Sequence, residues 1–337
     1  MNININGKIV GDGHPTYIIA EIGINHNGDV SLAKEMIEKA WECGVDAVKI
    51  QTFITEKFLH PSHPSYQYDI DSQIPHEKEQ EVWDFASQKK INLFSTPEEF
   101  ESLEFIKKQN PNLIKIAAMD FNYKNLIQKA ASLHKPIILS SGMSTLEEVL
   151  QALRWVKETG NNNCIILHCV SCYPTPPKAC NLMAIKTMKN VLECPVGFSD
   201  HTEGIHIPLV AVALGANAIE KHFTIDKSLP GPDQRCSIDS NDLKKLINNI
   251  REVEYAIGHG LKNPAMQEKE ARLFKRRGVY AAMDLEAGTV LNRKNVLFLA
   301  PSNEQSNVSD WPYMEGRKIN IDISKMSYIQ FSDIEKV

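Results

Sequence analysis

Two histidines lie at the ends of neighbouring predicted strands: His201 in the run GFSDHT and His222 in the run IEKHFT. Adjacent strands of a sheet are about 4.8 Å apart, so both imidazoles can reach one divalent ion. Glu21 ends the first predicted strand, which becomes the neighbour of the last one if the sheet closes into a barrel. A lone His201 is more typical of a hydrogen-bonded structural histidine, but its pairing with His222 favours a metal site.

Two lysines, Lys49 and Lys115, belong to the second and fourth predicted strands. Either one alone is compatible with a structural ion pair, whereas two on alternate strands favour the binding of an anion. Hydroxyl groups end the third, fifth and seventh strands, at Thr96, Ser140 and Ser199. Ammonium groups and several hydroxyl donors together suit a ligand that carries a phosphate and a carboxylate.

The remaining strand ends are polar as well. Burying a charge is costly unless the charge is paired or used, so polar groups at every strand end indicate an active site. His26, in NHNGD, is equally compatible with a role in shaping its loop, and Glu220 and Lys221 are predicted to be a structural ion pair without a chemical role. The other polar residues of the predicted ring are Gln51, Ser95, Ser171, Tyr173 and Asp200.

Short β-rich apolar runs alternate with amphipathic segments of helical period through residues 1–258. The helical segments 31–44 and 145–160 begin with Ser or Thr in N-cap position, and both, like 239–258, end at glycine. Eight strands, each followed by a helix-sized connection, are typical of a (β/α)8 TIM barrel, whereas a doubly wound sheet would require a G-x-G-x-x-G fingerprint that the sequence lacks. The predicted strands are 17–23, 47–53, 92–97, 113–118, 136–142, 164–170, 195–201 and 218–224.

The pattern changes after the barrel, which is predicted to occupy residues 1–258. Residues 259–275 are polar with some helical character and are predicted to be a linker. Residues 276–337 contain short β-like pieces separated by Gly, Asn and Pro, which predicts a small β-rich domain. A module of this size buries little apolar surface alone, so we expect it to dock on another surface.

Composition excludes several classes of protein. The 337 residues carry a net charge of −5 without a basic stripe, which argues against nucleic acid as a partner. No apolar run approaches the roughly 18 residues of a membrane helix, and no secretory signal is evident at the N-terminus. The seven cysteines are therefore predicted to be reduced thiols in the cytoplasm. Cys169 and Cys172 form a C-x-x-C, but no second such pair completes a zinc site.

Seven runs along the chain resemble the signatures of the sialic acid synthase family, which includes N-acetylneuraminate, legionaminate and pseudaminate synthases. The resemblance covers nearly the whole chain, because the C-terminal module is similar to the antifreeze-like (SAF) domain of that family. The runs occur in the family's order: IIAEIGINHNGD, VKIQTF, FSTP, ILSSGM, LHCVSCYPTP, GFSDHT and IEKHFTIDKSLPGPD.

The resemblance implies condensation of phosphoenolpyruvate with an open-chain N-acylated hexosamine-type aldehyde, giving a nonulosonic acid and phosphate. It implies Mn²⁺ or Mg²⁺ on His201 and His222, and Glu21 as the group that handles protons. It also implies a domain-swapped homodimer, in which the small domain caps the partner's barrel. The phosphoenolpyruvate-binding residues would be Lys49, Thr96, Lys115, Ser140 and Ser199, with Gln51, Asp120, Ser171, Tyr173 and Asp233 on the substrate pocket.

The chain departs from the family pattern mainly where the acceptor sugar would lie. Ala118 stands in place of a serine, Asp120 in place of a longer glutamate, and Ser171 in place of a frequent asparagine. Ala300, in LAPSN, stands where the SAF domain commonly offers an arginine to the substrate. The predicted metal and lysine residues are intact, so we expect the reaction to be retained and the acceptor to be unusual.

Two other functions remain open at this point. A metal-dependent barrel aldolase or sugar isomerase would use the same two histidines but would not need the two lysines. A family member that binds a sugar without turnover would be consistent with Ala118 and Ala300. Ice binding through the C-terminal module is disfavoured, because the module lacks repeated threonine ladders.

Overall fold

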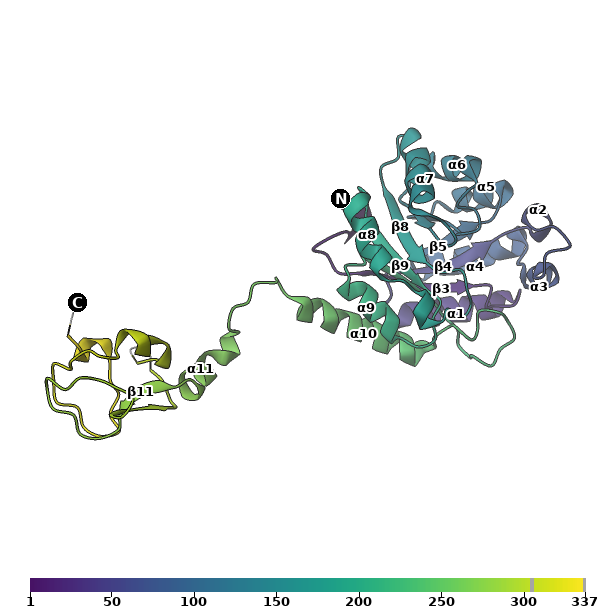
Figure 1. The fold of residues 1–337 in the computed structure, drawn as a ribbon. Coiled ribbons are helices and arrows are strands. Elements are labelled where there is room, and N and C mark those ends of the chain that lie inside the picture. Colours follow the sequence, from purple (N-terminus) through teal and green to yellow (C-terminus); the bar gives the residue numbers. More distant parts are fainter. Residues whose placement is uncertain (304–305, 336–337) are drawn as a thin grey trace. The chain divides into compact units, whose positions relative to one another are not determined.

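The computed structural model describes residues 1–303 and 306–335, and the chain divides into two compact units, Met1–Gly258 and His259–Val337 (Figure 1). The first unit contains a parallel sheet with the strand order β5-β4-β3-β10-β9-β8-β7-β6. β5 and β6, at the two ends of this order, lie side by side, so the sheet closes into the predicted barrel. The strands are β3 (Tyr17–Gly23), β4 (Ala47–Thr52), β5 (Leu93–Pro97), β6 (Ile114–Ile116), β7 (Ile137–Ser140), β8 (Cys164–Cys169), β9 (Val196–Asp200) and β10 (Ala218–His222).

Helices connect the strands and surround the barrel (Figure 1). Thr145 caps α7 in a capping box with Glu148, as its sequence position predicts. The cap of α1 is Asp29 rather than Ser31, because the Asp29 carboxylate accepts hydrogen bonds from the first-turn amides. The helices are α1 (Val30–Glu42), α2 (Thr55–Phe58), α3 (Tyr66–Ser72), α4 (His76–Gln88), α5 (Phe100–Gln109), α6 (Lys124–Ala131), α7 (Leu146–Glu158), α8 (Met183–Val191), α9 (His206–Ala213) and α10 (Ser240–Ile257), with a 3₁₀ turn at Pro177–Ala179. Within the described residues, no helix is both long and apolar enough to cross a membrane.

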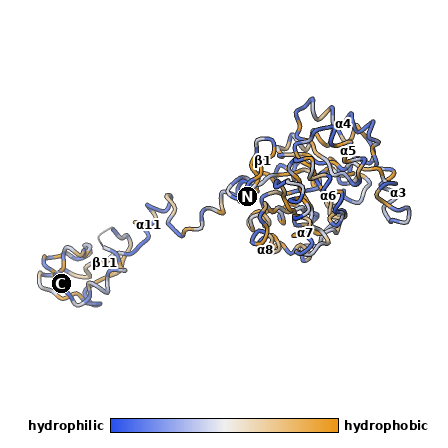
Figure 2. The backbone as a smooth tube through the Cα atoms, turned by 90° about the horizontal axis from the view of Figure 1, so that it is seen from above, coloured by the Kyte–Doolittle hydropathy of each residue, from blue (hydrophilic) through white to orange (hydrophobic). Residues whose placement is uncertain are grey.

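An N-terminal hairpin closes the bottom of the barrel. Its strands β1 (Ile3–Ile5) and β2 (Lys8–Val10) pair antiparallel across Asn6 and Gly7, both of which have positive φ. Ile3, Ile5 and Val10 are buried in one cluster with residues from the barrel interior. The strand prediction leaves this hairpin out, although Asn-Gly between apolar residues is a strong hairpin signal. Hydrophobic residues, orange in Figure 2, recur throughout the strands and helices of this unit.

The second unit has its own hydrophobic core, which includes Val279, Leu291, Trp311 and Ile323. Strands β11 (Gly278–Ala281) and β12 (Val296–Leu299) pair antiparallel, and single bridges such as Leu285 to Ile323 extend the β-structure. The stretch predicted to be a linker contains η2 (Met266–Glu268) and helix α11 (Lys269–Lys275). The later 3₁₀ turns are η3 (Val308–Tyr313) and η4 (Phe331–Asp333).

A buried carboxyl group outside the barrel should make stability depend on pH. Glu79 of α4 accepts hydrogen bonds from Thr52 and Trp83, and burial raises its pKa to about 7. Folding therefore becomes less favourable as pH rises from the unfolded value near 4.5 through 7, by on the order of 3 kcal/mol. Glu79→Gln keeps an oxygen for both donors and removes the titration. In urea unfolding, the free energy of unfolding of Glu79→Gln should equal that of the wild type at pH 4.5 and should exceed it most at pH 8.

The exposed Glu81 of the same helix supplies the control, since Glu81→Gln removes a carboxylate that water already solvates. A Glu79→Gln advantage that is the same at both pH values would contradict the prediction.

Candidate active site

A carboxylate between two lysines forms the floor of the site at the C-terminal ends of the strands. Lys49 Nζ and Lys115 Nζ lie 3.2 and 2.9 Å from the Glu220 carboxylate, and Ser199 Oγ donates a hydrogen bond to it over 2.9 Å. Glu21 Oε2 lies 2.6 Å from Lys49 Nζ on the other side. All five residues are buried, so the charges are screened little by water. Two carboxyl groups and two amino groups therefore face one another at the floor of the site.

The electrostatics of this cluster follow from burial and from the close charges. Burial alone would raise the pKa of Glu220, but Lys115 and Lys49 hold it well below its usual range, so Glu220 stays ionised. Burial, reinforced by the repulsion of Lys115, lowers the pKa of Lys49 to about 7. A lysine with this pKa exchanges its proton near neutral pH, and the Glu21 carboxylate is within reach of that proton.

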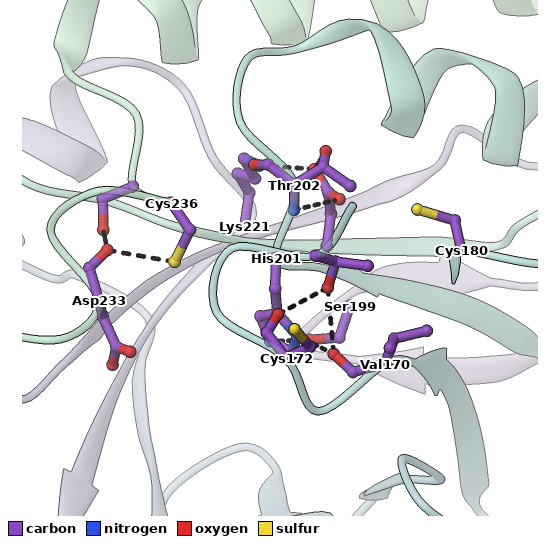
Figure 3. A network of polar contacts seen from close by, with 12 residues as sticks. Val170, Cys172, Cys180, Ser199, His201, Thr202, Lys221, Asp233 and Cys236 are labelled. Carbon is purple, nitrogen blue, oxygen red and sulfur yellow. Dashed lines mark hydrogen bonds and ion pairs between the residues drawn. The ribbon is translucent and has the colours of Figure 1, made fainter. Parts of the chain in front are cut away.

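Glu220 and Lys221 do not pair with each other, which corrects the prediction from sequence. Successive side chains of a strand point to opposite faces, so Glu220 enters the barrel and Lys221 leaves it. Lys221 Nζ lies 2.6 Å from Asp200 Oδ2 and also donates to the Thr202 carbonyl oxygen (Figure 3). Asp200, predicted as part of the polar ring, therefore braces the loop after β9 from outside. The sequence does contain a signal that Glu220 enters the barrel. Glu220 and His222 are two residues apart on one strand, so their side chains point to the same face.

Removing Lys221, which points out of the barrel, should lower the stability of the fold rather than the catalytic activity. Lys221→Met leaves the fully buried Asp200 carboxylate without its cation, and losing one partner of a buried pair typically costs about 3–5 kcal/mol. We expect a lower melting temperature than for the wild type. The double variant Lys221→Met, Asp200→Leu, which removes both charges, should recover much of the loss. No change in the melting temperature of Lys221→Met would contradict this role.

The two histidines lie together beside Tyr173 at the rim. The ring centroids of His201 and His222 are 5.4 Å apart, and that of Tyr173 is 4.2 Å from His201. His201 Nδ1 bonds to the Val170 carbonyl oxygen over 2.9 Å (Figure 3). A carbonyl only accepts, so Nδ1 carries the proton, and Nε2, which lies 3.4 Å from Ser199 Oγ, keeps its lone pair.

Both imidazoles are neutral, as metal ligands must be. Burial lowers the pKa of His201 to about 4, and burial together with the neighbouring His201 lowers the pKa of His222 well below its usual value. His222 Nδ1 is buried without a hydrogen-bond partner among the described residues and lies 3.7 Å from Asp233 Oδ2. The donor set therefore fits a divalent ion. The described part of the chain contains no group of three or more His, Cys, Asp or Glu side chains with metal-site geometry.

A cavity of about 90 Å³ connects the lysine cluster to the histidines. Two hydroxyls on its wall, Thr96 Oγ1 and Ser140 Oγ, have no hydrogen-bond partner within residues 1–303 and 306–335 and are free to bind a ligand. The apolar part of the wall is Ala117 and Ala118. The predicted site residues that line the cavity are Glu21, Lys49, Gln51, Thr96, Lys115, Ser140, Tyr173, Ser199, His201, His222 and Asp233.

Two predicted substrate residues, Asp120 and Ser171, do not line this cavity. Asp120 instead lines a pocket of about 310 Å³ together with Glu98, a residue for which no role was predicted. Ser171 packs against Gly142, where a Cβ atom would lie 2.4 Å from its Oγ.

His26 is buried and its Nδ1 accepts a hydrogen bond from the Gly28 amide, which fits a role in shaping its loop. Cys169 is buried and Cys172 exposed, and all seven cysteines are free thiols.

The sequence and the fold both match known proteins. The profile of the NeuB family matches residues 36–262. The chain is 34% identical to the N,N'-diacetyllegionaminic acid synthase of Legionella pneumophila, over 99% of both chains. It is also 34% identical to a pseudaminic acid synthase of Campylobacter jejuni, over 89% of this chain and 90% of that one. The solved N-acetylneuraminic acid synthetase of Leptospira borgpetersenii superposes with a TM-score of 0.76 at 34% identity, covering 80% of this chain and 95% of that one.

Proposed function

The chain belongs to the NeuB family, and from this premise we propose that it is a nonulosonic acid synthase. The reaction would join phosphoenolpyruvate, an N-acylated hexosamine-type aldose and water, and give a sialic-type 2-keto acid and phosphate. The acceptor would be N-acetylmannosamine or a 2,4-diacetamido-trideoxyhexose, in line with the relatives named as N,N'-diacetyllegionaminic and pseudaminic acid synthases.

The observation that carries this proposal is the lysine pair beside unpartnered hydroxyls. Lys49 and Lys115 are held by Glu220, yet each ammonium has three donors and can bind a phosphate or carboxylate oxygen as well. Thr96 and Ser140 add two hydroxyl donors on the same wall. A phosphorylated enol carboxylate needs this combination, whereas an aldolase or isomerase substrate without phosphate does not.

The chemistry would start at C3 of phosphoenolpyruvate, which attacks the aldehyde carbon and leaves a cationic centre at C2. Water adds to C2, and the tetrahedral intermediate expels phosphate. Glu21, next to Lys49, is placed to take the proton of that water or to supply one to the new hydroxyl. Ser199 and Lys115 hold the Glu220 carboxylate at the floor of the cavity.

The two histidines would bind the metal ion that the family resemblance implies. His201 and His222 fit Mn²⁺ or Mg²⁺ through neutral imidazoles, and the bound ion would supply Lewis-acid polarisation of the aldehyde. Asp233, with its pKa raised by burial to about 6, lies at the same rim and would meet the sugar hydroxyls. Tyr173 and Gln51 would complete the wall.

We also propose that the enzyme works as a domain-swapped homodimer in the cytoplasm. Seven free cysteines are typical of a reducing compartment. Light scattering would test the dimer: a monomeric mass would reject it. Ala300 lacks the charged side chain that an arginine at this position would offer to a substrate.

Inorganic phosphate release is the decisive assay. The purified protein should release phosphate only when phosphoenolpyruvate, Mn²⁺ and an acceptor are all present. The panel holds N-acetylmannosamine, mannose and the 2,4-diacetamido-trideoxyhexoses. Conversion of a sugar without phosphoenolpyruvate would instead support an isomerase or aldolase, and binding without conversion would support a non-catalytic sugar protein.

A further inference from the structure

Asn25, in the loop between β3 and α1, is fully buried and makes two hydrogen bonds with its side-chain amide. Its Nδ2 lies 2.9 Å from the Phe223 carbonyl oxygen and 2.9 Å from Ser237 Oγ. A carbonyl oxygen only accepts hydrogen bonds, so the atom that faces it is the amide nitrogen, whose two hydrogens serve the two contacts. Asn25 therefore bridges the end of β10 and the segment of chain that returns beside it.

The first of these contacts reaches, through the backbone, a histidine that is proposed to bind the metal. Phe223 directly follows His222, and its amide donates to the Glu21 carbonyl oxygen over 2.7 Å. The amide of Ile238 donates to the His222 carbonyl oxygen over 2.9 Å. Three hydrogen bonds thus hold the peptide groups around His222, and Asn25 supplies the one that comes from a side chain.

The second contact leads to Asp233, which lines the cavity. Ser237 Oγ accepts from Asn25 and donates to the Asp233 carbonyl oxygen over 2.7 Å. Cys236 Sγ donates to the same oxygen over 3.2 Å (Figure 3). The carboxylate of Asp233 lies 3.7 Å from His222 Nδ1. One amide is therefore the common origin of two short hydrogen-bond paths, and the paths end at two side chains that lie beside each other in the site.

The backbone of Asn25 is itself held in place. Its amide donates to the Ile22 carbonyl oxygen over 3.1 Å, and Gln234 Nε2 donates to its carbonyl oxygen over 3.1 Å. The helix that follows the loop is capped by Asp29. A side chain that extends from a fixed backbone can impose a position on the groups that it contacts.

We propose that Asn25 is a positioning residue, which holds His222 and Asp233 at the separation needed to bind a metal ion and the acceptor sugar together. This inference rests on the proposed function, and it gives a role to the first asparagine of the run NHNGD. Among the described residues, Asn25 is not part of the cavity lining, so it acts through Phe223 and Ser237 rather than on a substrate. Removing a hydrogen-bond partner of this indirect kind typically lowers metal affinity or activity by about 10- to 100-fold.

Two variants separate the two paths, since Asn25→Ala removes both hydrogen bonds and Ser237→Ala removes only the one that leads to Asp233. We expect Asn25→Ala to weaken Mn²⁺ binding by about 10-fold or more and to raise the KM for the acceptor. Ser237→Ala should raise the KM for the acceptor but keep Mn²⁺ affinity within about twofold. Electron paramagnetic resonance measures Mn²⁺ binding without substrates. The KM for phosphoenolpyruvate should change little in either variant, because other contacts hold the lysine cluster.

Asn161→Ala is the matched control, because it distinguishes positioning from a loss of stability. Asn161 is also buried, and its Nδ2 donates to the Ala131 and Lys135 carbonyl oxygens over 3.0 and 2.8 Å. Asn25→Ala and Asn161→Ala should both lower the melting temperature, since each leaves buried acceptors without a donor. Only Asn25→Ala should change Mn²⁺ affinity and the KM for the acceptor.

Three results would overturn the proposal: an equal loss of Mn²⁺ affinity in Asn25→Ala and Asn161→Ala, an unchanged Mn²⁺ affinity in Asn25→Ala, or an unchanged acceptor KM in Ser237→Ala. The last of these keeps the proposal testable if Asn25→Ala does not fold.

Mn²⁺ binding without substrates also keeps this inference apart from the proposed function. If Asn25→Ala binds Mn²⁺ more weakly than the wild type and no acceptor gives phosphate release, the positioning role stands and the synthase function falls. If the wild type releases phosphate and Asn25→Ala binds Mn²⁺ equally well, the positioning role falls and the function stands. A wild type that binds no Mn²⁺ also overturns the positioning role.

Discussion

His222→Ala is expected to lower kcat for phosphate release by at least about 10³-fold while leaving the fold intact. Lewis-acid activation contributes several kcal/mol of transition-state stabilisation, and each 1.36 kcal/mol corresponds to a tenfold change in rate. The fold should survive because His222 Nδ1 has no hydrogen-bond partner in the described residues, so its removal orphans no donor or acceptor. Steady-state phosphate release and the melting temperature together check both halves of the expectation.

Metal removal should reproduce the effect in the wild type. Dialysis against a chelator should abolish phosphate release, and added Mn²⁺ should restore it, whereas His222→Ala should not respond. Electron paramagnetic resonance of added Mn²⁺ gives a second readout, since the wild type should retain the ion and the variant should not. His206→Ala, which removes an exposed imidazole at the start of α9, is the matched control. Normal activity of His222→Ala would show that the metal assignment is wrong.

Lys115→Ala should weaken phosphoenolpyruvate binding far more than acceptor binding. The variant loses a buried cation and leaves the Glu220 carboxylate with Lys49 and Ser199 alone, so the floor of the cavity gains a net negative charge. The loss of a charge-assisted hydrogen bond to phosphoenolpyruvate should raise the KM for this substrate by about 10- to 150-fold. The KM for the acceptor should stay within about twofold, because the proposed function puts the acceptor beside the histidines and Asp233 rather than beside Lys115.

The control for Lys115→Ala is Lys124→Ala, which removes a half-exposed lysine paired loosely with Glu158 at 3.6 Å. Initial rates over a grid of both substrate concentrations separate the two KM values. A larger rise in the KM for the acceptor than for phosphoenolpyruvate would mean that the two substrates occupy the opposite ends of the cavity.

The barrel and most of its polar ring could be predicted because they depend on short-range patterns. Each predicted strand is an apolar run bounded by turn signals, and the observed strands differ from the predicted ones by a few residues at most. Polar residues at strand ends meet in any closed parallel barrel, so Lys49, His201 and His222 could be placed in one site without coordinates. The N-terminal hairpin was missed although Asn6-Gly7 signals it.

The pairing of the buried charges could not be predicted in the same way. Glu220 follows β10 inward and meets two lysines from β4 and β6, which are far from it in sequence. Its neighbour Lys221 turns outward and meets Asp200. Glu220 and Lys221 are adjacent in the sequence, which suggests an ion pair between them, but the geometry of a strand places their side chains on opposite faces.

The sequence by itself therefore determined the fold class, the positions of the strand ends and the chemical types of the groups that gather there, because these follow from periodicity and from barrel closure. Only the tertiary structure decided which charges neutralise each other, and that Asp120 lines a separate pocket with Glu98 rather than the cavity of the lysines and histidines. The physical reason is that the partner of a buried charge depends on the directions of side chains from strands that are distant in the sequence. No local sequence pattern contains this information.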